Sequence, residues 1–174
     1  MSPDRREALA TAAFTIRPIL PSDYPAVARI TLDAYEGNRD HLDDGYRNEL
    51  QDVAARAGAC PLLVAVGQDG TLLGGVTYVP GPDNPMSELE KEGEAGIRML
   101  AVHPSAQGLG VGRALTLACL ERARREGRSG VALYTRPANV PAQRLYASLG
   151  FERDAERDWQ YARGQWLWAY QLRF

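Results

Sequence analysis

The spacing of apolar positions changes along the chain between a period of two, typical of strands, and a period near 3.6, typical of helices. The strands it predicts are Phe14–Ile19, Pro61–Val66, Leu72–Val79, Ala95–Val102, Val131–Tyr134, Phe151–Gln160 and Gln165–Phe174. The predicted helices are one that begins at Pro21-Ser22-Asp23, one over His41–Ala57, one from Gly110 to Gly127 and one over Val140–Leu149. This order predicts an α+β domain with a mixed, mostly antiparallel central sheet of about six to seven strands flanked by four helices.

Two connecting segments contain the residues that mark turns. Gln68-Asp69-Gly70 predicts a hairpin between two of the strands. The longer segment, Pro80–Gly93, is rich in proline, glycine and acids. It is expected to be a surface loop or, alternatively, a mobile flap over a substrate.

Length and composition are those of one ordinary globular domain. The chain has 174 residues, of which 45% are hydrophobic and 24% charged, enough to bury a core. Residues 1–12 are expected to form a flexible tail and residues 13–174 a single domain. The formal charge of -2 gives no reason to expect nucleic acid or a membrane surface as partner, and no apolar run has the length of a membrane span. A cytoplasmic protein is expected.

The cysteines and histidines of this chain do not indicate a metal site. Cys60 and Cys119 each lie among apolar residues and have no CxxC partner, and the chain has only two histidines. Two buried, reduced thiols and no bound metal are therefore expected.

A glycine-rich turn joins a predicted strand to a predicted helix. The turn reads Gln107-Gly108-Leu109-Gly110-Val111-Gly112-Arg113. Three glycines allow the backbone to approach a ligand closely, and the unpaired N–H groups at a helix start favour phosphate oxygens. The spacing differs from the G-x-G-x-x-G dinucleotide fingerprint, and no Gly-Lys-Ser/Thr follows as in a Walker A loop. The turn therefore predicts a phosphate site of another kind.

Two motifs in the chain resemble the GNAT acetyltransferase superfamily. The first is a Q-x-x-G-x-G pattern at Gln107, Gly110 and Gly112, preceded by Leu100-Ala101-Val102-His103-Pro104. The second is similar to an N-x-x-A-x-x-L-Y-x-x-L-G-F signature and reads Asn139-Val140-Pro141-Ala142-Gln143-Arg144-Leu145-Tyr146-Ala147-Ser148-Leu149-Gly150-Phe151. The predicted element order also matches that fold from about Phe14 to the C-terminus. The chain thus resembles an acetyl-CoA-dependent N-acetyltransferase.

The resemblance implies that acetyl-CoA is the cosubstrate and that it lies where two strands splay apart. The backbone of Leu100, Ala101 and Val102 would bond the pantetheine arm like an added strand. The pyrophosphate would be held by the N–H groups of Gln107, Gly108, Leu109, Gly110, Val111, Gly112 and Arg113. Asn139 would lie near the distal part of the arm or, alternatively, serve only as a helix N-cap.

Acetyl transfer to an amine needs a polarised thioester carbonyl, a proton donor for the thiolate and a base for the amine. The backbone N–H of Val102 is the candidate oxyanion donor. Tyr146 is the candidate general acid, with a packed core tyrosine as the alternative. Relatives often have a catalytic glutamate at the position that is Gly96 here, so Glu94, on the same strand face, is the candidate base through a water molecule. The alternative for Glu94 is a solvated acid at the end of a loop.

The acceptor would meet the thioester between the first two helices, the central strands and the terminal hairpin. Tyr35, Tyr46 and Tyr78 are the candidate contacts, because aromatic rings pack on an amine or hold a cation. Their alternative is a place in the core or on the surface. Other side chains in these regions are His41, Asp43, Asp44, Trp159 and Trp166.

The function expected from these residues is acetyl transfer from acetyl-CoA to a primary amine of a small molecule. One alternative is a protein lysine or N-terminal acetyltransferase, and another is a regulatory module that binds acetyl-CoA without turnover. The apolar C-terminal strand would allow pairing in a homodimer.

Overall fold

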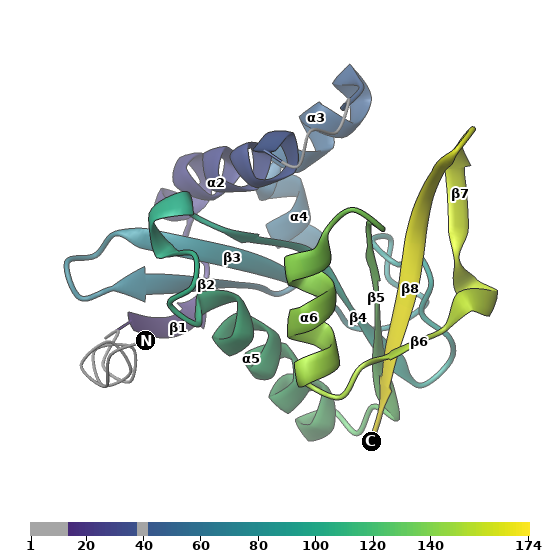
Figure 1. Ribbon diagram of the computed structural model, residues 1–174. Coiled ribbons are helices and arrows are strands. Elements are labelled where there is room, and N and C mark those ends of the chain that lie inside the picture. The colour runs from purple at the N-terminus through teal and green to yellow at the C-terminus, as the bar shows by residue number, and fades with distance from the viewer. Residues whose placement is uncertain (1–13, 38–41) are drawn as a thin grey trace, which may run out of the picture.

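The computed structural model describes residues 14–37 and 42–174 and has helices on both faces of one sheet (Figure 1). The strands are β1 (Phe14–Pro18), β2 (Leu62–Gly67), β3 (Leu72–Val79), β4 (Glu94–Val102), β5 (Gly130–Thr135), β6 (Glu152–Arg153), β7 (Trp159–Ala162) and β8 (Gln165–Arg173). The helices are α2 (Tyr24–Gly37), α3 (Asp44–Gln51), α4 (Val53–Ala59), α5 (Val111–Arg125) and α6 (Val140–Ser148). Short 3-10 turns are η1 (Pro21–Asp23), η2 (Pro104–Ala106) and η3 (Ala155–Arg157). The predicted α+β class and mostly antiparallel sheet are confirmed.

The strand order is β1-β2-β3-β4-β5-β8-β6, with β7 also paired to β8. Neighbouring strands are antiparallel except β4 and β5, which are parallel and are joined through α5. A parallel pair needs such a crossover, because its strands run in the same direction. Helices α2 to α4 cover one face of the sheet, and α5 and α6 cover the other (Figure 1).

The apolar spacing read from the sequence corresponds to two packed layers. On one face, Leu115 and Cys119 of α5 pack with Ile97 and Leu133 of the sheet. On the other face, a separate cluster joins residues of α2 and α4 to β2 and β3, namely Val27, Val53, Cys60, Leu62, Val64 and Val79. Both cysteines are buried and free, as predicted.

The parallel strands β4 and β5 pair over only part of their length. Their register runs from Glu94 opposite Gly130 to Ile97 opposite Leu133, and β4 then continues to Val102 without β5 beside it. Where the pairing ends, β4 is irregular: Met99 has a φ of 50° and the register with β3 shifts. A non-glycine residue in this region is uncommon and marks a local distortion of the strand. The strand edge beyond Ile97 is therefore open toward β5.

Two predicted elements differ from the structure. The single helix predicted over His41–Ala57 is wrong, because α3 and α4 are separated at Asp52, whose ψ of 69° is not helical. The Asp52 carboxylate instead accepts a hydrogen bond from the Ala55 N–H at 3.0 Å and caps α4. His41 lies outside the described residues. The first strand of the predicted terminal hairpin is divided into β6 and β7 by η3.

The C-terminal strand is not an edge of the sheet. β8 pairs with β5 on one side and with β6 and β7 on the other. Its backbone is thus already used, and the homodimer pairing through this strand lacks the open edge it needs.

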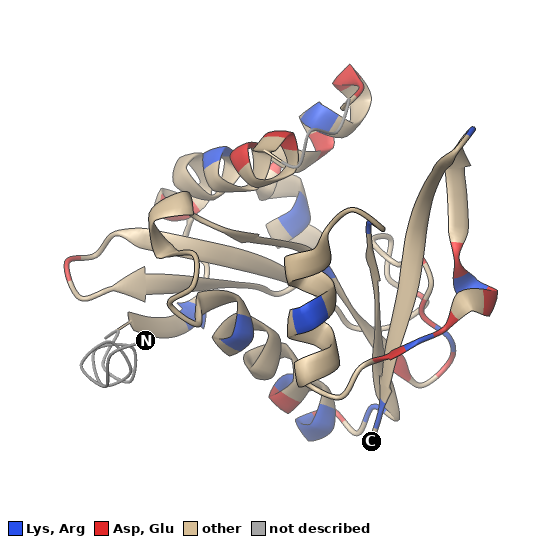
Figure 2. Ribbon diagram, in the orientation of Figure 1, with Lys and Arg blue, Asp and Glu red and all other residues tan. Residues whose placement is uncertain are grey.

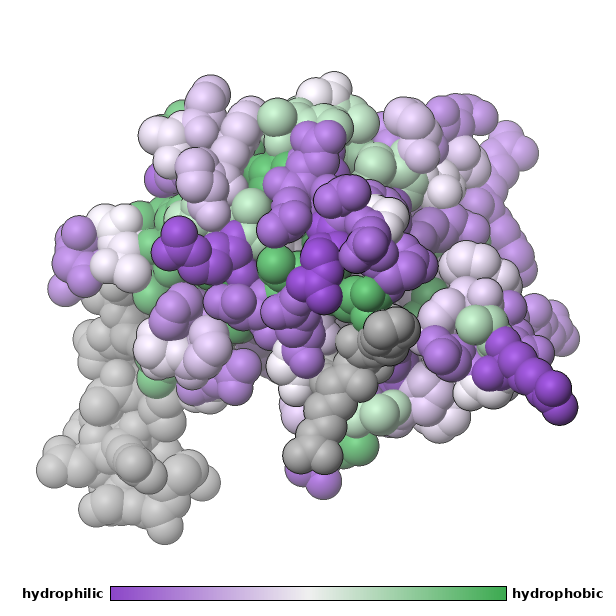
Figure 3. All heavy atoms as spheres, turned by 90° about the horizontal axis from the view of Figure 1, so that it is seen from above, coloured by the Kyte–Doolittle hydropathy of each residue, from purple (hydrophilic) through white to green (hydrophobic). Residues whose placement is uncertain are grey.

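The surface has acidic and basic residues mixed together. Figure 2 shows Asp and Glu beside Lys and Arg along α2 and at the C-terminal end of α5. The face seen from above is mostly hydrophilic, with smaller hydrophobic areas between the polar side chains (Figure 3). None of the helices in the described ranges is both long and apolar enough to cross a bilayer.

Candidate active site

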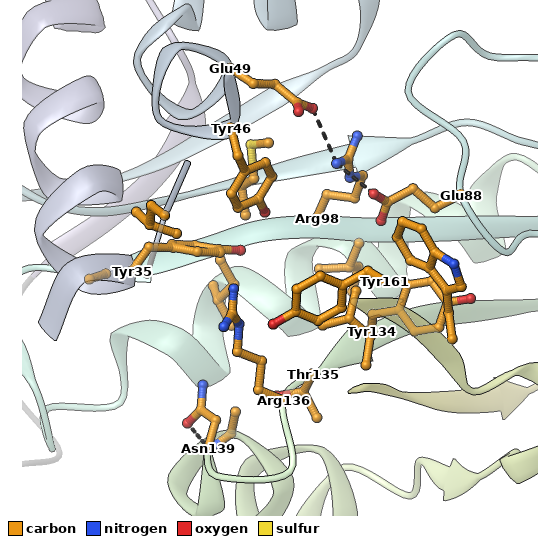
Figure 4. A pocket seen from close by; sticks show the side chains of 18 of the residues that line it. Tyr35, Tyr46, Glu49, Glu88, Arg98, Tyr134, Thr135, Arg136, Asn139 and Tyr161 are labelled. Carbon is orange, nitrogen blue, oxygen red and sulfur yellow. Dashed lines mark hydrogen bonds and ion pairs between the residues drawn. The ribbon is translucent and has the colours of Figure 1, made fainter. Parts of the chain in front are cut away.

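A cavity of about 600 Å³ lies where β4 and β5 separate. Ile97 and Leu100 line it from β4, and Tyr134 and Thr135 line it from β5. Other walls come from α2, α3, the 80–93 loop, α6 and β7 (Figure 4). The volume lies in the range of small-molecule sites, about 300 to 1,000 Å³.

The glycine-rich turn has the backbone geometry of an anion site. Gly108 and Gly110 have φ values of 78° and 82°, in the left-handed region that favours glycine. Gly110 is the N-cap of α5, and the Ala114 N–H makes the first bond to its carbonyl, at 3.0 Å. The N–H groups of Val111, Gly112 and Arg113 precede this first helical donor and therefore have no acceptor within the helix. They lie at the positive end of the helix dipole, where phosphate oxygens bind.

The space around this turn is open to a ligand. A Cβ atom built on Gly108 or Gly110 would meet no atom within 4 Å, so these glycines serve the backbone conformation and leave room above it. Arg113, in the first turn of α5, donates to Ser148 Oγ of α6 at 3.0 Å. This partner is neutral and leaves the arginine charge available to an anion.

Val102 directs its backbone N–H into the gap between β4 and β5. The His103 N–H donates to the Leu73 carbonyl of β3 at 2.8 Å, and Val102 lies opposite Gly74. Because successive N–H groups in a strand point to alternate sides, the Val102 N–H and carbonyl point away from β3. On that side β5 has already diverged, so these groups face the opening.

Asn139 and Tyr146 of the second motif line the cavity. The Asn139 side chain accepts from the Ala142 N–H at 3.2 Å, so the N-cap role is confirmed and the residue also faces the cavity (Figure 4). Tyr146 is 5% exposed, and its ring packs near those of Phe151 and Tyr170. Burial raises the pKa of Tyr146, which keeps its hydroxyl protonated at neutral pH.

Aromatic side chains form part of the cavity wall. Tyr35 of α2 and Tyr46 of α3 both line the cavity, with ring centroids 6.0 Å apart. Trp159 and Tyr161 of β7 line it from the hairpin. The sequence did not single out Tyr161, although it lies two residues after Trp159 and therefore shares its strand face. Figure 4 shows Tyr35, Tyr46 and Tyr161 around the same space.

An ion-pair network in the cavity wall was also missed. Arg98 of β4 lies 3.3 Å from a Glu49 carboxylate oxygen and 2.7 Å from one of Glu88 (Figure 4). Burial raises the pKa of Glu88, and the charge of Arg98 opposes that shift. The three residues are distant in sequence, so no local pattern could reveal the network.

Of the side chains proposed for catalysis or acceptor contact, Glu94 and Tyr78 lie outside the cavity lining. The Glu94 carboxylate is bound by Arg157 at 2.6 and 3.2 Å and by the Lys91 N–H at 2.9 Å. Tyr78 is fully buried in the layer beneath α5, where its hydroxyl donates to Glu126 at 2.7 Å. Strand alternation places Tyr78 on the face that α5 covers, away from the cavity lining, so it does not contact an acceptor there.

The groups that the site offers to a ligand are mainly backbone hydrogen-bonding groups. Its open turn offers backbone N–H groups, and the β4 edge offers further donors and acceptors beside a cavity. Within residues 14–37 and 42–174, no group of three His, Cys, Asp or Glu side chains is placed to hold a metal ion.

Comparison with known proteins agrees with this geometry. Residues 24–151 match the Acetyltransferase (GNAT) family. A mycothiol acetyltransferase from Thermomonospora curvata is 39% identical over 147 residues, which are 81% of this chain and 45% of that protein. The chain thus spans about half the length of the curated relatives it matches.

Two solved structures share the fold. The protein yncA of Salmonella typhimurium, solved with its cofactor acetyl-CoA, superposes with a TM-score of 0.67 at 25% identity, over 92% of this chain and 94% of that chain. A ribosomal-protein-alanine N-acetyltransferase from Brucella melitensis superposes with a TM-score of 0.65 at 25% identity, over 92% and 99%. The chain belongs to the GNAT acetyltransferase family.

Proposed function

We propose that the chain transfers the acetyl group of acetyl-CoA to a primary amine of a small molecule. The observation that carries this proposal is the continuity of three features: the α5 N-terminus, the open edge of β4 and the aromatic cavity. In that order, these features would serve as a phosphate-binding turn, a strand edge for an extended arm and an acceptor chamber.

The first two features would hold acetyl-CoA. Within the turn from Gln107 to Arg113, the N–H groups of Gln107 and Leu109 donate to the Pro104 and Ala106 carbonyls at 3.4 and 3.3 Å. The remaining N–H groups of the turn would bind the pyrophosphate, and the Leu100–Val102 edge would bond the pantetheine arm. Acetyl-CoA supplies a thioester carbon that is open to attack by an amine. The Val102 N–H faces the gap and would stabilise negative charge on the carbonyl oxygen.

The cavity supports a small, cationic acceptor. Its size suits a small molecule, and its lining combines aromatic rings with three acids and two arginines, namely Asp43, Glu49, Glu88, Arg98 and Arg136. Aromatic faces and carboxylates both attract an ammonium group. The relatives named mycothiol acetyltransferase also support a small-molecule acceptor.

Tyr146 would donate a proton to the leaving thiolate. Tyr146 lines the cavity, and burial raises the pKa of its hydroxyl, so the hydroxyl carries its proton at neutral pH. The incoming amine must also lose a proton, which costs about 4 kcal/mol for an alkyl ammonium of pKa about 10.4 near pH 7.4. Glu94 is engaged by Arg157 and lies outside the lining, so it is a poor candidate for that step.

The test is release of free thiol from acetyl-CoA in the presence of a panel of small primary amines. The proposal predicts release that depends on both substrates and saturates with the amine. A lysine-containing peptide and a protein N-terminus serve as comparison acceptors. Faster transfer to either would favour a protein acceptor, and no transfer to any amine would contradict the proposed function.

A further inference from the structure

A buried carboxylate occupies the space above Gly96 of β4. A Cβ atom at position 96 would lie 1.7 Å from Glu90 Oε1 and 2.6 Å from Glu90 Cδ. Any other residue at position 96 would therefore collide with the Glu90 side chain. Arg98, two residues further along the same strand face, lines the cavity. The carboxylate thus lies on the acceptor side of the sheet, next to the cavity.

The two oxygens of this carboxylate have different surroundings. Glu90 is 8% exposed, and its Oε2 accepts from Ser87 Oγ at 2.6 Å and from the Glu88 and Leu89 N–H groups at 2.9 and 3.3 Å. Its Oε1 is buried and has no hydrogen-bond partner within the described residues. A purely structural role in the loop would account for Oε2 but leaves Oε1 unexplained.

Ser87 connects this carboxylate to the cavity. The serine lines the cavity, and its hydroxyl donates directly to Glu90. The other carboxylates nearby are bound to arginines: Glu88 and Glu49 to Arg98, and Glu94 to Arg157. Within the described part of the chain, Glu90 is the acid of these four that forms no ion pair with an arginine.

The negative charge of Glu90 affects the pKa values of neighbouring groups. Burial raises the pKa of Glu88 and of Cys60, and the nearby Glu90 carboxylate raises both further. Burial likewise raises the pKa of Tyr134 on β5, and Glu90 adds to this shift. Arg98 of β4 is the cation of this neighbourhood and opposes the shifts at Glu88 and Cys60.

We propose that Ser87 and Glu90 form the route by which the acceptor ammonium loses its proton. The ammonium gives a proton to Ser87 Oγ while the serine hydroxyl proton moves to Glu90 Oε2. The products are a neutral amine, an unchanged serine hydroxyl and a protonated Glu90. The amine nitrogen then bonds to the thioester carbon, the C–S bond breaks, and Tyr146 gives its hydroxyl proton to the thiolate. The nitrogen, now bonded to the acetyl carbon, loses its second proton, which restores the Tyr146 hydroxyl. Glu90 finally releases its proton to water.

This proposal rests on the proposed function. In it, Ser87 contacts the substrate, and Glu90 acts through Ser87 as a positioning residue. It also gives the 80–93 loop a role. The loop was predicted to be a surface loop or a flap, whereas its Leu89 and Glu90 are buried against the sheet.

The first test compares Glu90→Gln with Glu92→Gln, an exposed acid of the same loop. The acceptor is the panel amine with the largest wild-type kcat/KM. Glu90→Gln is expected to lower kcat on the order of 100-fold, the usual contribution of a general base, with unchanged acetyl-CoA affinity by calorimetry. The decrease in kcat caused by Glu90→Gln should be smaller for an acceptor amine of low pKa. Glu92→Gln should match the wild type.

The pH profile separates a proton acceptor from a structural acid. The wild-type rate should fall as the pH falls, because a proton must leave the acceptor ammonium before the amine can attack. In Glu90→Gln this fall should follow the pKa of the amine alone. Ser87→Ala should cause a similar loss, and the double variant should be little worse than either single one. A larger change of the pH profile in Glu88→Gln than in Glu90→Gln would overturn the proposal.

A transplant tests the position of the carboxylate. Glu90→Ala removes the side chain that fills the space above Gly96, and Gly96→Glu then brings a carboxylate there from the strand. The kcat of the combined variant is expected to be at least tenfold higher than that of Glu90→Ala alone. No recovery in a folded double variant would contradict the proposed location of the base.

A stability measurement tests the contact without any turnover. Gly96→Ala should lower Tm by about 3 to 10 °C in the wild-type background, because overpacking is destabilising. In the Glu90→Ala background the same change should have little effect. Equal effects in both backgrounds would contradict the contact.

The outcomes distinguish this inference from the proposed function. If no amine of the panel yields free thiol, the proposed function and the inference both fail. If wild-type turnover is clear and Glu90→Gln retains kcat within twofold, the inference alone fails.

Discussion

The two halves of the site are built in different ways. On the proposed cofactor side, the α5 N-terminus and the β4 edge offer backbone N–H and carbonyl groups. On the acceptor side, the cavity wall is made of side chains from separate elements, including Tyr35, Arg98, Glu88 and Trp159. The backbone half depends on local conformation, whereas the side-chain half depends on which distant residues meet. Substitutions should therefore affect binding of the two substrates separately.

The largest expected effect is on the cofactor side, at Gly110. Valine there would be strained at a φ of 82° and would disturb the start of α5. We expect Gly110→Val to weaken acetyl-CoA binding on the order of 100-fold, measured by calorimetry. Gly127→Val is the matched control, because Gly127 has a φ of 70° at the other end of the same helix. Equal weakening by both variants would indicate a general loss of stability instead.

Tyr146 lies between the two halves, and its substitution should affect the chemical step. Tyr146→Phe keeps the ring packing but removes the proton donor, so we expect kcat to fall about 10- to 100-fold with unchanged affinity for acetyl-CoA. Tyr170→Phe is the control, since its ring lies 6.3 Å from that of Tyr146 and it is also buried. Full turnover by Tyr146→Phe in steady-state kinetics would exclude the general-acid role.

Trp159 should report on the acceptor side alone. Removal of its ring from the cavity wall should raise the KM of the amine about 3- to 10-fold and leave the KM of acetyl-CoA unchanged. Trp166→Ala provides the comparison, because Trp166 is similarly exposed in the same hairpin but does not line the cavity. An increase in the acetyl-CoA KM for Trp159→Ala would contradict the separation of the two halves.

The smallest expected effect concerns the hairpin that supports this wall. Asp158 is bound by Arg153 and accepts from the Ala169 N–H, and the Arg153 hydrogen bond lowers its pKa. A lowered pKa contributes stability above the unfolded pKa, near 3.9, and this contribution is lost as the pH falls through the folded value. Asp158→Asn should cost about 1 kcal/mol at pH 7, a modest value because Arg153 is 32% exposed.

Urea unfolding of the wild type and Asp158→Asn at pH 7 and near pH 3 measures this difference. The difference between the two proteins in the free energy of unfolding should be smaller at the lower pH. If this difference is the same at both pH values, the charge of the Asp158 carboxylate does not contribute to stability.

The same contrast explains what the sequence could predict. Turn residues and short motifs have local consequences, so the strand–turn–helix around Gly110 and the Asn139 cap followed from the residues themselves. Tyr78 was misplaced on the acceptor side because spacing along β3 does not say which face is the core. The fit of Glu90 over Gly96 and the pairing of Arg98 with Glu88 are tertiary contacts without a local pattern.

A crystal structure of the protein with acetyl-CoA tests the central claim most directly. The account predicts density for the diphosphate at the N–H groups from Gln107 to Arg113, and for the thioester in the gap beside Val102. Density for acetyl-CoA at another surface, or an empty gap at a saturating concentration, would contradict it.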